Sequence, residues 1–184
     1  METSLEQLQN IMDEADLLHD EVAVNRALDR LALQITDCVK SENPILLCVL
    51  TGGIYFTGHL LSRLSFPLEL DYVHATRYKG NTVGGGLDWI AKPCIDMRNR
   101  TLVILDDILD EGATLVQLQE YCKAQGAKAV FSAVLVEKRH DRKAIGAAAS
   151  FVGLIVEDRY VFGAGMDYKG YLRNQPGIYA VKGM

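Results

Sequence analysis

The chain has 184 residues, of which 49% are hydrophobic and 23% are charged. It is long enough to bury one sizeable core and short for two domains. The formal net charge of −5 argues against a nucleic-acid-binding surface, which needs clustered basic residues. No apolar run approaches the roughly 20 residues of a membrane span. We therefore expect a single domain, residues 1–184, that binds neither nucleic acid nor a membrane.

The amino-terminal residues and the cysteines indicate the compartment. The first thirty residues are rich in Asp and Glu and contain no basic stretch followed by an apolar run, so we expect no secretory signal. The four cysteines lack the short paired spacing of a zinc site or a redox motif: Cys38, Cys48, Cys94 and Cys122. These features favour a reduced, cytoplasmic protein.

Two amphipathic helices are expected first, over residues 5–18 and 24–39, because apolar residues recur there every three or four positions. Four continuous apolar runs of strand length follow, at residues 45–50, 101–105, 130–136 and 151–156. Strands without polar alternation are covered on both faces, which predicts a parallel sheet.

Helical patterns over residues 55–64 and 113–125 lie between those runs, so strands and helices alternate as in a doubly wound α/β fold. Ligands in such folds bind at the carboxyl ends of the strands. Residues 79–100 do not fit the alternation. They contain four glycines around a lone Trp89, which is typical of a lid or a mobile connection.

Residues 101–115 carry the clearest chemical signal. Asp106 and Asp107 follow a buried apolar run, where an unpaired carboxylate would be costly. A ribose diol or a magnesium ion would satisfy such acceptors, and Asp110 would face the same crevice. A helix begins just beyond, where free N–H groups, Gly112 and the Thr114 hydroxyl could hold a phosphate.

A simpler interpretation of the same residues is that Asp106 and Asp107 form an ordinary turn and Asp110 caps the helix. The stretch lacks the lysine of a Walker loop and the glycine spacing of a dinucleotide fingerprint. Neither ATP hydrolysis nor hydride transfer is therefore supported.

The whole stretch resembles the phosphoribosyl pyrophosphate motif of type I phosphoribosyltransferases. The resemblance implies an α/β fold with a central, mainly parallel sheet flanked by helices, a small hood and a flexible lid loop. It also implies that Asp110 is the catalytic residue, acting as general base or electrostatic partner, and that the ribose phosphate binds at Asp106, Asp107, Glu111, Gly112, Ala113 and Thr114. Glu111 stands where the family usually has Thr or Ser, so its backbone N–H and not its side chain would contact the phosphate.

Three other segments are similar to pyrophosphate-binding parts of the family. The turn at residues 50–53 is similar to one that holds a non-proline cis peptide, here between Leu50 and Thr51, with Thr51 and Gly52 facing the pyrophosphate. Residues 74–80 are similar to the mobile catalytic loop, which would give this role to Arg77 and Tyr78 as well. Arg173 would reach the same group. Without the family, the turn is equally a connector and Arg173 a surface residue.

The purine would bind to residues near the carboxyl terminus, by the same resemblance. Lys138 would donate to the 6-oxo group of the base, Tyr160 would stack on it and Val161 would meet its edge through the backbone. The alternative for Lys138 is a solvated basic strand end, and Tyr160 could belong to the core. His19, His59 and His140 have no partner that the sequence indicates.

The resemblance therefore implies a purine salvage enzyme that transfers 5-phosphoribosyl from phosphoribosyl pyrophosphate to hypoxanthine or guanine, giving IMP or GMP and pyrophosphate. Its cofactor would be Mg²⁺, with Asp106, Asp107 and Asp167 near the metal. Its partners would be these small-molecule substrates and copies of itself in a homodimer or homotetramer. The alternatives are a xanthine- or pyrimidine-directed relative and a non-enzymatic, nucleotide-binding RNA regulator on the same fold.

Overall fold

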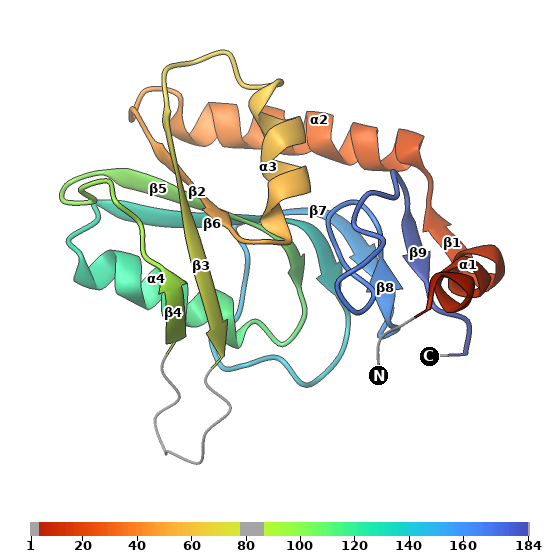
Figure 1. Cartoon of the computed structure of the whole chain (residues 1–184). Coiled ribbons are helices and arrows are strands. Elements are labelled where there is room, and N and C mark those ends of the chain that lie inside the picture. Colours follow the sequence, from red (N-terminus) through yellow and green to blue (C-terminus); the bar gives the residue numbers. More distant parts are fainter. Residues whose placement is uncertain (1–3, 78–86, 184) are drawn as a thin grey trace.

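The computed structural model describes residues 4–77 and 87–183. Its centre is a six-stranded sheet in the order β4-β3-β2-β5-β6-β7 (Figure 1). All neighbouring strands are parallel except β3 and β4, which are antiparallel. The strands are β2 (Ile45–Val49), β3 (Glu69–Arg77), β4 (Leu87–Ala91), β5 (Thr101–Leu109), β6 (Ala129–Lys138) and β7 (Phe151–Val156).

Helices cover both faces of this sheet. Helices α2 (Glu21–Val39) and α3 (Gly53–Leu61) lie on one face, and α4 (Ala113–Ala124) lies on the other (Figure 1). Side chains alternate between the faces: Leu46 packs into the cluster beneath α2 and α3, while Ile45 and Leu47 pack into the cluster beneath α4. All three are fully buried, which explains why this strand is continuously apolar.

A separate three-stranded sheet lies beside the main one, in the order β1-β9-β8. Its strands are β1 (Asp16–His19), β8 (Val161–Phe162) and β9 (Ile178–Ala180), and helix α1 (Leu5–Glu14) packs near it (Figure 1). The cluster of Leu8, Phe162, Tyr168 and Val181 joins helix and sheet. This unit corresponds to the expected hood. Among the described residues, no helix is long and apolar enough to cross a membrane.

The expected first helix is too long. Helix α1 ends at Glu14, and Leu18 belongs to β1, which pairs with β9 from the other end of the chain. A helical spacing of apolar residues continues by chance into that strand, and only the distant partner decides its conformation. The remaining helices and strands differ from expectation by a few residues at their ends, with one exception that matters for the site: β5 continues through Leu109.

Two strands of the main sheet, β3 and β4, were missed, as were the three strands of the small sheet. Residues 69–77 form β3, so positions 74–77 extend a strand and are not part of a loop. Trp89 lies on β4, and the centroid of its ring is 4.6 Å from that of Tyr121 on α4. It is partly buried and packs against the core beneath α4. The rest of the expected lid, residues 78–86, lies outside the described residues.

Candidate active site

The two carboxylates of the motif lie within strand β5 and not after it. Asp106 still pairs with Val134 of β6, and Asp107 is only 8% exposed. Oδ1 of Asp106 accepts a hydrogen bond from the Asp107 backbone N–H at 3.0 Å. Oδ1 of Asp107 accepts one from the Ile108 N–H at 2.8 Å. The interpretation of this pair as an ordinary turn is therefore wrong.

The surroundings of both carboxylates disfavour negative charge. Burial raises the pKa of Asp106 well above its ordinary value, and the charge of Asp107 adds to the effect. Burial also raises the pKa of Asp107, although the side chain of Asp106 and the guanidinium of Arg173 act against it. A cation or a pair of hydroxyl donors at this edge would relieve both costs.

The turn after β2 lies directly against Asp107. The Leu50–Thr51 peptide bond is cis, as the resemblance implied. A Cβ at Gly52 would overlap the carboxylate of Asp107, so no larger residue fits that position without a shift. The close approach of this turn to β5 therefore depends on glycine.

The loop after β5 leads into α4 without a side-chain cap. Gly112 is the N-cap residue, has a φ of 76° and leads into the first helical residue, Ala113. The side chain of Asp110 bonds to residues of the neighbouring segment instead, so its proposed alternative role as helix cap is wrong. N–H groups in the first turn of a helix have no partner within the helix, which suits an anion.

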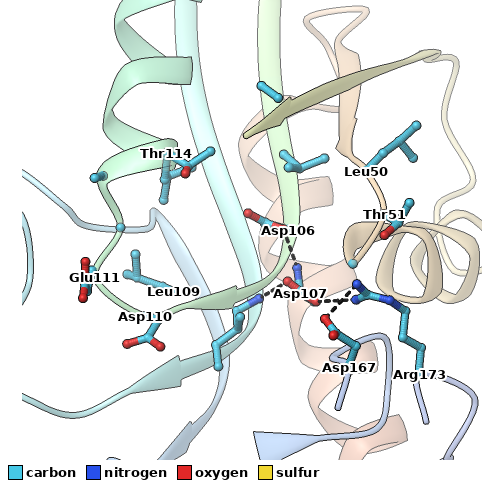
Figure 2. A pocket seen from close by; sticks show the side chains of 17 residues that line it. Leu50, Thr51, Asp106, Asp107, Leu109, Asp110, Glu111, Thr114, Asp167 and Arg173 are labelled. Atoms are coloured by element: carbon cyan, nitrogen blue, oxygen red, sulfur yellow. Dashed lines mark hydrogen bonds and ion pairs between the residues drawn. The ribbon is translucent and has the colours of Figure 1, made fainter. Parts of the chain in front are cut away.

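A cavity of about 340 Å³ lies between this loop and the turn after β2 (Figure 2). It brings together most of the predicted ribose-phosphate and pyrophosphate residues. Its lining includes Thr51, Gly52, Asp106, Asp107, Asp110, Glu111, Gly112, Ala113, Thr114, Asp167 and Arg173. The backbone of Arg77 ends β3, while its side chain and the whole of Tyr78 lie outside what the structure describes.

Arg173 reaches the cavity from the carboxyl-terminal part of the chain (Figure 2). One guanidinium nitrogen lies 2.8 Å from Oδ1 of Asp167. The other lies 3.7 Å from Oδ2 of Asp107 and donates to the Gly165 carbonyl at 2.6 Å. The alternative of a surface arginine is therefore wrong: its guanidinium group joins the hood segment to the carboxylate of Asp107 on β5.

A second cavity, of about 260 Å³, adjoins the first. The two share Asp107, Ile108, Asp110 and Asp167. The remaining lining residues are Lys138, Tyr160, Val161 and Met166, so all three predicted purine contacts occur there. Lys138 is 9% exposed, which excludes a solvated strand end. Tyr160 is 41% exposed, and its ring meets that of Tyr168 edge-on at 5.5 Å.

Asp110 lies where the two cavities meet, and two donors hold its carboxylate. Nζ of Lys138 lies 2.8 Å from Oδ2, and Nε2 of His140 lies 2.7 Å from Oδ1. Partial burial by itself would raise the pKa of Asp110, but the hydrogen bonds from Lys138 and His140 outweigh it and hold the pKa below its ordinary value. Sequence reasoning missed His140. Its place two residues after the end of a parallel strand was the available signal.

The acidic side chains of the cavity could bind a metal ion together with a phosphate-bearing ligand, but not by themselves. Among residues 4–77 and 87–183, no group of three or more His, Cys, Asp or Glu side chains is arranged to hold a metal ion. Magnesium usually keeps several waters and takes one or two protein carboxylates together with phosphate oxygens. Asp106, Asp107 and Asp167 fit that pattern and do not form an all-protein cage.

This architecture, with a parallel sheet, carboxylates and a helix start at its carboxyl edge and a small separate sheet beside them, is the type I phosphoribosyltransferase fold. The chain belongs to the phosphoribosyltransferase family, since residues 14–169 match the family model of the phosphoribosyl transferase domain.

Individual relatives are similar along nearly the whole chain. The chain is 30% identical over 173 residues to the hypoxanthine-guanine-xanthine phosphoribosyltransferase of Tritrichomonas foetus, covering 94% of each protein. It is 30% identical over 176 residues to the hypoxanthine-guanine phosphoribosyltransferase of Streptococcus pneumoniae, covering 95% of this chain and 96% of the relative. A solved structure of a hypoxanthine-guanine-xanthine phosphoribosyltransferase superposes with a TM-score of 0.85 at 28% identity, over 93% of this chain and 99% of that one.

Proposed function

We propose that residues 1–184 form a single domain that transfers 5-phosphoribosyl from phosphoribosyl pyrophosphate to hypoxanthine or guanine, with magnesium as cofactor. The observation that carries the proposal is the pair of adjoining cavities that meet at Asp110. One is lined by carboxylates, a helix start and an arginine, and the other by a buried lysine and an exposed tyrosine. The names of the relatives support the same reaction.

Phosphoribosyl pyrophosphate would occupy the larger cavity. Its 5-phosphate would accept hydrogen bonds from the N–H groups of residues 110–114, and Thr114 would add a hydroxyl. Its diol would donate to Asp106 and Asp107. The raised pKa values of these residues mean that their negative charge is poorly stabilised, and hydroxyl donors or a cation would stabilise it. Its pyrophosphate would meet the N–H groups of the Gly52 turn and the fork of Arg173. Arg77 and Tyr78 remain proposed for the same group.

The purine would occupy the smaller cavity, stacked on the half-exposed ring of Tyr160 and meeting the backbone of Val161. An ammonium group has only donors, so Lys138 suits a 6-oxo purine and has nothing to accept from the 6-amino group of adenine. Its contact with Asp110 is compatible with this role, because an ammonium group has three protons to share.

In the reaction, the bond between purine N9 and C1′ forms as the bond from C1′ to the pyrophosphate oxygen breaks. Asp110, held as a carboxylate, accepts the proton that the purine loses. Arg173 stabilises the charge that develops on the departing pyrophosphate. Magnesium, when bound, supplies further neutralisation of that charge, and Asp106, Asp107 and Asp167 are the residues that would hold it.

The decisive experiment is steady-state turnover of hypoxanthine, guanine, xanthine, adenine and uracil with phosphoribosyl pyrophosphate and magnesium, monitored by the release of pyrophosphate. We expect turnover with hypoxanthine or guanine and little with adenine. If the enzyme prefers xanthine or a pyrimidine, it is the xanthine- or pyrimidine-directed relative and this proposal is wrong. Nucleotide binding without turnover of any base, together with RNA binding at physiological salt, would favour the regulator.

The small-molecule substrates are the partners that this proposal requires. We further propose a cytoplasmic location and assembly into a homodimer or homotetramer. Light scattering on the purified protein would measure the assembly directly.

A further inference from the structure

His140 is buried against the carboxylate that the reaction uses. Its side chain is only 3% exposed, and Nε2 lies 2.7 Å from Oδ1 of Asp110, the oxygen that Lys138 does not bind. A buried ring at hydrogen-bond distance from a carboxylate oxygen restricts the rotation of that carboxylate about its χ2 angle. His140 is therefore placed to control the direction in which Asp110 presents its oxygens.

The contact of the other ring nitrogen indicates which of the two nitrogens carries the proton of the neutral ring. Nδ1 of His140 accepts a hydrogen bond from the backbone N–H of Arg142 at 3.0 Å. A nitrogen that accepts from a main-chain N–H carries no proton, so the proton of the neutral ring is on Nε2 and points at Asp110. The neutral ring is thus a donor to the carboxylate without having to be protonated.

The segment that supplies this backbone N–H is anchored on both sides. The guanidinium of Arg142 binds both carboxylate oxygens of Asp158, at 2.6 and 2.9 Å, two residues before Tyr160. The N–H of Ala144 donates to the carbonyl of Glu111 in the phosphate loop at 2.8 Å. The loop after β6 therefore joins the base cavity, the phosphate loop and the ring of His140.

We infer that His140 is a positioning residue for Asp110: its Nε2–H fixes the carboxylate so that Oδ2, which is shared with Lys138, faces the base. This inference rests on the proposed function and extends it to a residue outside both cavity linings. Loss of the donor would let Asp110 rotate and would slow the chemical step, while the binding of phosphoribosyl pyrophosphate would persist.

Two substitutions of similar size separate the two hydrogen bonds of the ring. In His140→Gln, the amide nitrogen reaches the position of Nε2 and can still donate to Asp110. In His140→Asn, the shorter amide can still accept from the Arg142 N–H but falls short of Asp110. We expect His140→Asn to lower kcat about tenfold, the scale of one hydrogen bond to a charged group, with an unchanged KM for phosphoribosyl pyrophosphate. His140→Gln should stay within about threefold of the unmodified enzyme.

The control is His19→Leu, which removes a histidine hydrogen bond to a backbone carbonyl outside both cavities. Nε2 of His19 lies 3.3 Å from the carbonyl oxygen of Ile155. Its kcat should not change. Thermal melting of every variant checks the fold independently, and the comparison of Asn with Gln holds even if both melt somewhat below the unmodified chain.

A double substitution tests whether His140 acts through Asp110. Once Asp110 is Asn, a positioning residue for the carboxylate has nothing left to position, so Asp110→Asn with His140→Asn should be as slow as Asp110→Asn alone. An independent tenfold loss in the double variant, or equal kcat for the Asn and Gln variants, overturns the role of His140 and leaves the proposed function standing. Absence of turnover by the unmodified enzyme with every base overturns both.

Discussion

Nζ of Lys138 lies 2.8 Å from Oδ2 of Asp110, although 28 positions separate the two residues in the chain. Parallel pairing of β5 with β6 brings them together, since Leu109 and Glu137 are direct neighbours in the ladder. The contact joins the proposed donor to the base with the proposed acceptor of its proton.

Asp110→Asn should lower kcat by about 10²-fold or more, the usual range for an acid-base group, because an amide cannot accept the purine proton. Nucleotide binding, measured by calorimetry, should persist, since the amide has nearly the size of the carboxylate and its oxygen still accepts from one of the two donors, Lys138 or His140. Asp141→Asn, an exposed carboxylate nearby, is the control and should leave kcat unchanged. Full activity of the Asp110 variant would remove Asp110 from the mechanism.

Lys138→Ala should raise the KM for hypoxanthine by at least about tenfold, because a hydrogen bond from a charged group contributes about 1.5–3 kcal/mol. Discrimination against adenine should weaken at the same time. The control is Arg139→Ala, the adjacent exposed cation, which should change neither quantity. If adenine is already the best base for the unmodified enzyme, the assigned role of Lys138 is wrong.

Gly52→Ala should lower kcat/KM for phosphoribosyl pyrophosphate strongly, because the new methyl group overlaps the carboxylate of Asp107. Such overpacking costs about 1–3 kcal/mol of stability, which a melting curve would register. Gly58→Ala is the matched control. Gly58 lies in α3, the helix that Gly52 precedes, and a Cβ there would have no neighbouring atom within 4 Å. This substitution should stabilise the protein by about 0.5–1 kcal/mol and leave activity intact. Equal activities of the two variants would contradict the steric argument.

Asp106→Asn should stabilise the protein in EDTA at pH 7 by about 1 kcal/mol while weakening the binding of phosphoribosyl pyrophosphate. The pKa of Asp106 is raised in the folded state, so folding favours its protonated form and the unmodified chain loses stability as the pH rises through that pKa. The amide does not titrate. The advantage of the variant should therefore be largest at neutral pH and should vanish below about pH 4, the unfolded range of Asp.

Urea unfolding at several pH values measures this difference, and the rise in melting temperature on adding ligand with magnesium measures binding. A variant that is less stable than the unmodified chain at pH 7 would contradict the raised pKa of Asp106. A variant with an undiminished ligand shift would remove Asp106 from the diol site.

The local part of the site could be predicted from the sequence because its signals are local. An apolar run, two carboxylates, a glycine and a helix start follow one another within residues 101–115, and strand, turn and helix each have their own short-range requirements. The cavity at Gly112 and Thr114 agrees with that prediction. The cis bond after Leu50 agrees with what the resemblance to the family implied. The apolar runs of β2, β5, β6 and β7 likewise indicated a parallel sheet before any contact was known.

Long-range contacts decided the rest. Leu18 continues a helical spacing but belongs to β1, because Leu17 and His19 on either side of it pair with β9. The position of His140 just after a parallel strand does not identify its partner, and only the pairing of β5 with β6 places its ring against Asp110. Arg173 enters the cavity only because the hood packs beside the main sheet. Spacing along a chain determines which residues share a strand or a helix, while the distances between strands and layers arise only when the apolar faces pack together.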